Sequence, residues 1–98
     1  MADKLKIIRG SGNVFLDLGF PPHEAQSLFL RSHLMIEIEK LIKTRRLSRE
    51  RAARRLGVTQ TRLNQLRTHK IEKFSLDDLV SMLGHAGMRV EMRVKKAA

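Results

Sequence analysis

A short polar run at residues 59–65, Thr-Gln-Thr-Arg-Leu-Asn-Gln, carries the side chains of this chain that are best suited to specific recognition chemistry. Gln and Asn can each pair bidentately with adenine, Arg can pair with guanine, and the methyl group of Thr can contact that of thymine. Such a set is typical of a surface that reads base edges in the groove of a nucleic-acid duplex. The alternative is that Gln60 and Gln65 are ordinary surface residues, and base reading by at least one of them is the favoured interpretation.

The positive charge of the chain is concentrated around this run. The formal net charge is +10, and residues 43–73 contain 11 basic and 2 acidic residues, whereas residues 1–42 contain five of each. A surplus confined to one segment indicates a polyanionic partner, with nucleic acid favoured over an anionic membrane. The alternative is a solvated helix face without a partner, which is the usual meaning of a basic run.

Other kinds of chemistry have no support in the residue types. There are no Cys residues, and the four His residues show no metal-ligand spacing, so we expect no metal and no other cofactor. Neither Ser11 nor Ser48 has an identifiable His–carboxylate pair, so we expect that the protein is not an enzyme. No signal peptide and no apolar stretch long enough to cross a bilayer are recognisable, which favours a cytoplasmic, nucleoid-associated protein.

The segment around the polar run has the spacing of two short helices that meet across a tight turn. Ser48 and Thr59 can cap these helices with their hydroxyl groups. The geometry requires a small residue where the helices approach, a Gly at the turn, an apolar residue after it and an apolar face on the second helix. The residues that fill these positions are Ala53, Gly57, Val58, Leu63 and Leu66. The pattern therefore predicts a helix-turn-helix from Ser48 to Leu66.

Residues 47–66 resemble the helix-turn-helix of the Xre/Cro repressor family. The wider chain resembles HigA-type antitoxins in three further segments, GSGNVFLDLG at 10–19, KIEKFSLD at 70–77 and AGMRV at 86–90. The resemblance covers most of residues 8–94 and implies a lambda-repressor-like fold. Related sequences usually carry Gly at the position of His69, and His tolerates a left-handed backbone better than most residues do.

The resemblance also implies which residues contact DNA. The second helix of the motif would enter the major groove by its N-terminal end. Base contacts are then expected from Gln60, Thr61, Asn64 and Gln65. Phosphate contacts are expected from the flanking residues Arg45, Arg46, Arg49, Arg54, Arg67, His69 and Lys70. Phosphate contacts would set affinity and register, whereas base contacts would set the sequence that is read.

The rest of the chain is expected to complete one all-α domain of four to five helices with a C-terminal dimerising β-strand. Residues 1–20 are interpreted as an N-terminal arm, residues 21–87 as the helix-turn-helix domain, and residues 88–98 as a strand and tail. One helix should begin at Pro21-Pro22, and the last should begin after Ser75 and end at Gly87. Residues 88–94 alternate apolar and charged side chains, which is the period of a half-buried strand.

A strand at residues 88–94 needs a partner for its backbone groups and its apolar face. The favoured partner is the same strand of a second copy, paired through Met88, Val90, Met92 and Val94. The competing partner is the segment Lys4–Ile8 of the same chain. A symmetric dimer would place two recognition helices about one turn of DNA apart and would require a palindromic operator.

The function that follows is that of a sequence-specific repressor that binds duplex DNA. The resemblance implies an antitoxin that represses its own operon and neutralises a RelE-like ribonuclease toxin by protein–protein contact. It also implies that the toxin binds the arm, through Phe15, Leu16, Leu18 and Phe20, although these side chains could instead fold onto the core. The alternatives are a stand-alone Xre-type regulator without a toxin, then an RNA-binding module, and last an enzyme.

Overall fold

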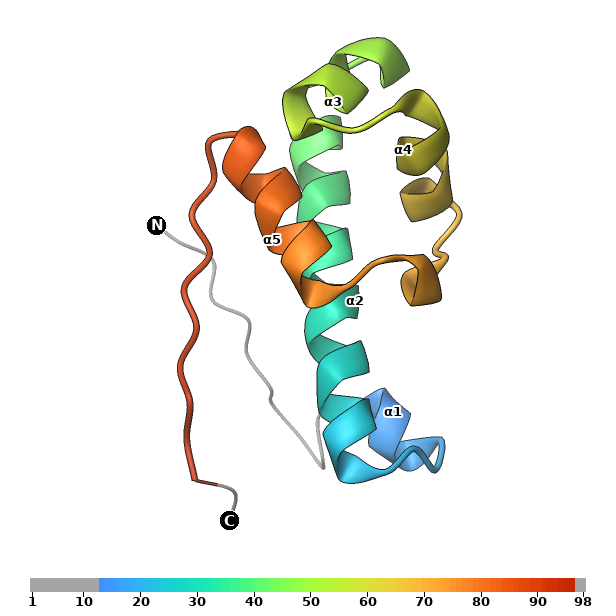
Figure 1. The fold of residues 1–98 in the computed structure, drawn as a ribbon, viewed down its shortest axis with the longest axis vertical. Coiled ribbons are helices and arrows are strands. Elements are labelled where there is room, and N and C mark those ends of the chain that lie inside the picture. The colour runs from blue at the N-terminus through green and yellow to red at the C-terminus, as the bar shows by residue number, and fades with distance from the viewer. Residues whose placement is uncertain (1–12, 97–98) are drawn as a thin grey trace.

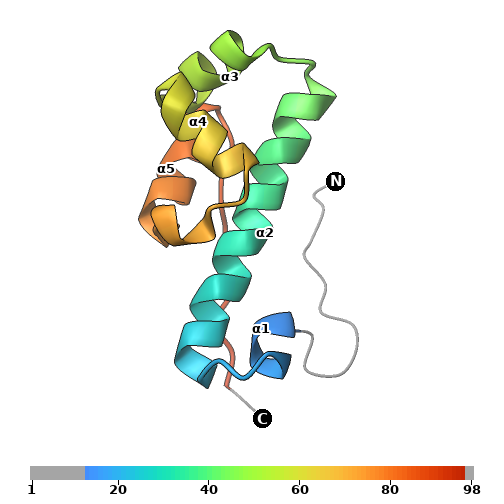
Figure 2. The ribbon, with the colours of Figure 1, turned by 90° about the vertical axis from the view of Figure 1, so that its right-hand side faces the viewer.

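The computed structural model describes residues 13–96, which contain five α-helices and one 3-10 helix (Figure 1). The elements are α1 (Val14–Asp17), α2 (Pro22–Thr44), α3 (Arg49–Leu56), α4 (Gln60–Arg67), η1 (Ile71–Lys73) and α5 (Leu76–His85). The long α2 forms the axis of the molecule, with α3 at one end and α1 at the other (Figures 1 and 2). Helices α4 and α5 lie beside the second half of α2. The expectation of a small all-α domain is confirmed.

The first turn of α2 explains why the helix begins where it does. Pro22 occupies a position whose N–H would have no helical partner, and Glu24 lies near the positive end of the helix dipole. The helix then continues unbroken to Thr44. Its buried side chains are Ala25, Met35, Ile38, Leu41 and Ile42. Four of these five lie in the second half, which is therefore the part of α2 that builds the core.

The core fills the space between α2 and the three shorter helices that follow it. Phe74, directly after η1, is its largest fully buried side chain. The other buried contributions of these later elements are Ala52, Ala53, Leu56, Leu63, Leu66, Leu79, Met82, Leu83 and Ala86. Because apolar side chains of all four helices meet here, the orientation of α3 and α4 is set by the same core that holds α5.

Hydroxyl caps define the first residues of α3, α4 and α5. The backbone N–H groups of Arg51, Arg62 and Asp78 donate to the side-chain oxygens of Ser48, Thr59 and Ser75, respectively. The third of these caps is a capping box, because the Asp78 carboxylate also accepts from the backbone N–H of Ser75. All three caps were expected from the sequence, and the structure confirms them.

The short η1 helix was not expected from the sequence. It is held to α2 by Arg31, whose Nη1 lies 3.3 Å from the carbonyl oxygen of Ile71 and 3.2 Å from that of Phe74. These two bonds join residues that are 40 and 43 positions apart. They secure the connection between α4 and α5 to the central helix.

Part of the predicted N-terminal arm packs against α2. Residues 1–12, including the competing strand partner at residues 4–8, lie outside the described residues. Asn13 caps α1 by accepting from the N–H of Phe15, and its Nδ2 donates to the carbonyl oxygen of Ala25 at 3.1 Å. The rings of Phe15 and Phe20 meet edge to face, with centroids 6.0 Å apart. Residues 14–17 of the predicted arm are thus helical.

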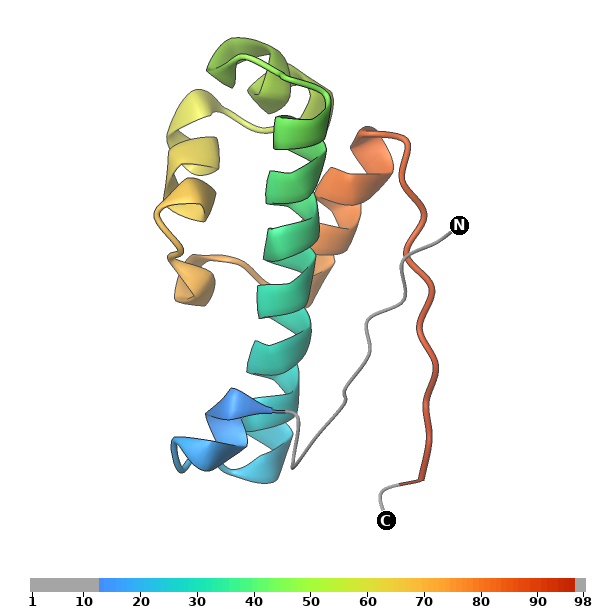
Figure 3. The ribbon, with the colours of Figure 1, turned by 180° about the vertical axis from the view of Figure 1, so that it is seen from behind.

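The predicted C-terminal strand is not found, because no residue between 13 and 96 is in a β-strand. Residues 88–96 instead run as an extended segment from α5 back toward the α1 end (Figures 1 and 3). The physical reason is that a strand exists only through hydrogen bonds to a neighbour, and no neighbouring strand lies within the described part of this single chain. Among the predicted pairing residues, Val90 packs against the core, whereas Met88, Met92 and Val94 are exposed.

Candidate nucleic-acid interface

The turn between α3 and α4 depends on a left-handed glycine. Gly57 has φ 73° and ψ 29°, and its N–H donates to carbonyl oxygens of the last turn of α3. The N–H of Val58 then donates to the carbonyl oxygen of Ala53 at 3.0 Å, and the Val58 side chain packs against the core. Leu63 and Leu66 are fully buried beneath α4. The five residues predicted to build the motif therefore lie together at the α3–α4 junction and under α4.

The opposite face of α4 presents the predicted base-reading residues. Gln60, Thr61 and Asn64 are exposed, and Gln65 is half-buried. Gln60 and Asn64 form one pair at helical spacing and Thr61 and Gln65 form another, so the four side chains share two adjacent rows. This arrangement offers amide and hydroxyl groups on one short helix of the size that the major groove admits.

Arg62 lies on α4 but does not point freely outward as the sequence suggested. Its Nη2 is 3.1 Å from Oδ2 of Asp78, its Nη1 is 3.2 Å from Oε1 of Gln65, and its guanidinium carbon is 4.1 Å from the ring centroid of Phe74. Sequence reasoning missed this role because the partners Phe74 and Asp78 follow a separate turn. A signal for part of this arrangement was present in the sequence, because the i, i+3 spacing of Arg62 and Gln65 makes their side chains neighbours on the helix surface.

The carboxylate of Asp78 is well placed to hold Arg62. The N–H of Ser75 donates to Oδ2 at 2.9 Å, and the Asp78 N–H donates to the Ser75 hydroxyl at 3.0 Å. The hydrogen bonds with Ser75 are the main cause that lowers the pKa of Asp78 below its usual value. Burial opposes this shift, and the nearby Arg62 charge adds a weaker lowering effect. Asp78 is therefore an anion at neutral pH.

The predicted phosphate-contacting residues flank α3 and α4 and are all exposed. Arg45 and Arg46 follow α2, Arg49 opens α3, and Arg54 lies 4.0 Å from Glu50 across one turn of that helix. Arg67, His69 and Lys70 occupy the end of α4 and the loop after it. His69 adopts the left-handed φ of 62° for which Gly is common, and its Nδ1 lies 3.8 Å from a Glu39 carboxylate oxygen.

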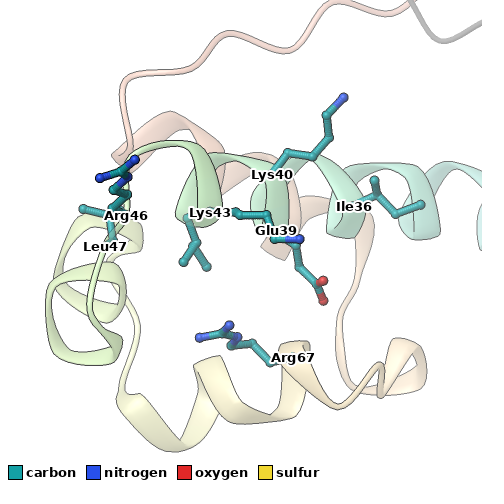
Figure 4. A pocket seen from close by; sticks show the side chains of 8 residues that line it. Ile36, Glu39, Lys40, Lys43, Arg46, Leu47 and Arg67 are labelled. Atoms are coloured by element: carbon teal, nitrogen blue, oxygen red, sulfur yellow. The ribbon is translucent and has the colours of Figure 1, made fainter.

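A pocket of about 320 Å³ lies between the C-terminal half of α2 and the end of α4 (Figure 4). Its charged lining consists of Lys40, Lys43, Arg46, Arg67 and a single carboxylate, Glu39. Arg46 and Arg67 were predicted as phosphate contacts, whereas Lys40 and Lys43 were not. The ammonium of Lys40 points away from the hollow (Figure 4) and lies 3.6 Å from a Glu37 carboxylate oxygen. The remaining cations still outnumber Glu39, which favours an anionic group such as a phosphate.

The four predicted toxin-binding residues differ in exposure. Leu18 is 69% exposed, Leu16 and Phe20 are 38% and 37% exposed, and Phe15 is half-buried. Phe15 also lines a largely apolar second pocket with Met35, Ile36 and Ile71, among others. Leu16 in α1 and Leu18 directly after it are thus available on the surface, and Phe15 is the most buried of the four.

Two further observations limit the kinds of site in the described range, residues 13–96. No three His, Asp or Glu side chains there converge as a metal site requires. No helix in the same range is long and apolar enough to cross a membrane.

Comparison with known families gives one match. A family model described as a helix-turn-helix domain matches residues 14–95, which covers α1 to the C-terminal segment. No curated protein sequence matches the chain. The matched range therefore includes every predicted base and phosphate contact.

Proposed function

Because this chain belongs to the helix-turn-helix domain family, we propose that it is a sequence-specific transcriptional repressor that binds duplex DNA. Domain membership supports DNA binding by a regulator. The observation that carries the finer proposal is the face of α4 with Gln60, Thr61, Asn64 and Gln65, flanked by the seven predicted phosphate-contacting residues. In this role the chain binds and positions itself on DNA and catalyses no reaction.

The proposal is tested by separating backbone contacts from base contacts. Each phosphate contact adds about −0.9 to the slope of log K against log salt concentration. Arg49→Ala should therefore make this slope shallower by about one unit per bound protomer on every sequence, whereas Lys95→Ala, an equal loss of charge in the C-terminal segment, should leave it unchanged. Gln60→Ala should keep the slope and lose about 1–3 kcal/mol of discrimination at a single base pair.

The measurement is fluorescence anisotropy on duplex DNA over a range of salt concentrations, with an RNA hairpin as competitor. Equal losses for Arg49→Ala and Lys95→Ala would show that the charge acts non-specifically. Preferential binding of the RNA hairpin would favour the RNA-binding alternative over a repressor.

We further propose that the repressor is a homodimer on a palindromic operator. Support comes from the C-terminal segment, where Met88, Met92 and Val94 expose apolar side chains and residues 88–96 are already extended. Pairing with the same segment of a second copy would satisfy both the backbone groups and the apolar face. Two copies of α4 would then lie about one turn of DNA apart.

We also propose that the protein is a cytoplasmic antitoxin that represses its own operon and neutralises a RelE-like ribonuclease toxin. Support comes from the resemblance of residues 10–19, 70–77 and 86–90 to HigA-type antitoxins, and from the exposed Leu16 of α1 and Leu18 directly after it. Co-expression with the product of an adjacent small reading frame should give a complex that survives purification. The double variant Leu16→Asp, Leu18→Asp should lose the complex and keep DNA binding. Absence of any such neighbour would favour a stand-alone Xre-type regulator.

A further inference from the structure

The side chain of Arg62 is held on three sides. Its guanidinium carbon lies 4.1 Å from the ring centroid of Phe74, and one of its nitrogens lies 3.1 Å from the Asp78 carboxylate. Its second terminal nitrogen donates to Oε1 of Gln65 at 3.2 Å. The guanidinium is planar and offers donors in a rigid fork, so two fixed partners also fix the direction of the third bond.

The partners of Arg62 are themselves anchored to the fold. Phe74 is 1% exposed, and its carbonyl oxygen accepts from Arg31 of α2. Asp78 belongs to the capping box of α5, where it accepts from the N–H of Ser75. A chain of contacts therefore leads from the core and α5 to the amide of Gln65. Rotation of Arg62 away from Gln65 would disturb contacts to two elements at once.

These contacts fix the orientation of the Gln65 amide, that is, which side its oxygen and its nitrogen face. A side-chain amide that presents both its oxygen and its nitrogen to the major groove binds adenine well, because adenine offers one acceptor and one donor there. Here the oxygen faces a cationic donor and its hydrogen bond is charge-assisted. Exchange would place the amide N–H₂ against the guanidinium, donor against donor. The amide nitrogen is therefore the atom that faces a base without competition from Arg62, whereas the oxygen keeps one lone pair beside the guanidinium.

We propose that Arg62 is a positioning residue that makes Gln65 a reader of guanine rather than of adenine. Guanine presents two acceptors, N7 and O6, to the major groove, and the two N–H bonds of the Gln65 amide match them. Adenine would need its N6 amino group to donate to the second lone pair of the Gln65 oxygen, beside the charged guanidinium that already occupies the first. Two donors, one of them charged, would then crowd one oxygen, which disfavours adenine. This inference rests on the proposed function, since it concerns which base a sequence-specific DNA-binding helix selects.

The test is selection of binding sites from a random duplex library with the full chain and three variants. Gln65→Ala identifies the base pair that Gln65 reads, as the position at which sequence preference is lost. At that position the unmodified protein should select guanine over adenine by about tenfold. Arg62→Met should remove most of this preference, and adenine should then be selected at least equally.

The third variant, Asp78→Asn, keeps the test informative if Arg62→Met unfolds the domain, which circular dichroism would show. Asp78→Asn retains Arg62 and an acceptor for Ser75 but weakens the grip on the guanidinium, so it should shift the preference part of the way toward adenine. Selection of adenine by the unmodified protein, or an unchanged guanine preference in both variants, would overturn the inference. A Gln65→Ala variant with unaltered preferences would overturn it too, while leaving sequence-specific binding intact. Enrichment of no duplex sequence at all would instead refute the proposed function, and the inference with it.

Discussion

Gly57→Ala is expected to lower the free energy of unfolding by about 2–4 kcal/mol, through two separate effects. The left-handed φ of 73° strains any residue that has a Cβ atom. A Cβ atom at this position would also lie 2.9 Å from Cγ of His85, so the imidazole ring would have to move. Because Gly57 forms the turn between α3 and α4, the substitution should weaken DNA binding in proportion to the loss of folded protein.

Two other glycines of the chain separate these effects. Gly87 has φ 83°, and a Cβ atom added there would meet no atom within 4 Å, so Gly87→Ala should show the backbone strain alone, about 1–2 kcal/mol. Gly84 lies in α5 with an ordinary φ and the same open space, so Gly84→Ala should raise stability by about 0.5 kcal/mol. Urea unfolding followed by circular dichroism measures all three. If Gly57→Ala were no more harmful than Gly87→Ala, contact with His85 would contribute nothing.

The local parts of the fold were predictable from the sequence because their causes are local. A hydroxyl group three positions before an N–H, as at Ser48 and Thr59, requires only the geometry of one helical turn. The same holds for Gly57 at the end of α3. Periodic apolar residues placed the buried faces of α4 and α5 because one side of a short helix must face the core.

The parts that were missed depend on residues far apart in the chain. The contacts of Arg62 with Phe74 and Asp78 require η1 and α5 to fold back against α4, and no spacing rule along α4 reveals them. The bonds from Arg31 to the η1 region are of the same kind. The pocket between α2 and α4 likewise gathers cations from positions 40 to 67, which only the tertiary structure brings together.

The C-terminal segment shows a different limit of sequence reasoning. Alternation at residues 88–94 predicts which side chains share a face, and it contains no information about the neighbouring strand. In the described single chain only Val90 reaches the core, while Met92 and Val94 stay 57% and 93% exposed. Exposed apolar side chains that cluster on one segment, as Met92 and Val94 do, are typical of an interface, such as one between two copies.

Truncation after Val90 is therefore expected to convert dimers into monomers and to lower the affinity for a palindromic duplex by about 10²–10⁴-fold. The loss arises because binding of the second α4 helix is intramolecular in a dimer and becomes a separate event in a monomer. Affinity for a duplex that contains a single half-site should stay within a few-fold of that of the full chain. Analytical ultracentrifugation gives the oligomeric state, and fluorescence anisotropy gives both affinities.

This truncation point is chosen so that folding and dimerisation are affected separately. It keeps the 2.8 Å hydrogen bond from the N–H of Met88 to the carbonyl oxygen of Leu83, which closes α5, and it keeps Val90 against the core. It removes Met92 and Val94, so the double variant Met92→Asp, Val94→Asp in the full-length chain is the matched control and should give the same monomer. If both proteins stayed dimeric with unchanged affinity, the interface would lie elsewhere, and the exposed Leu16 and Leu18 would become the next surface to test.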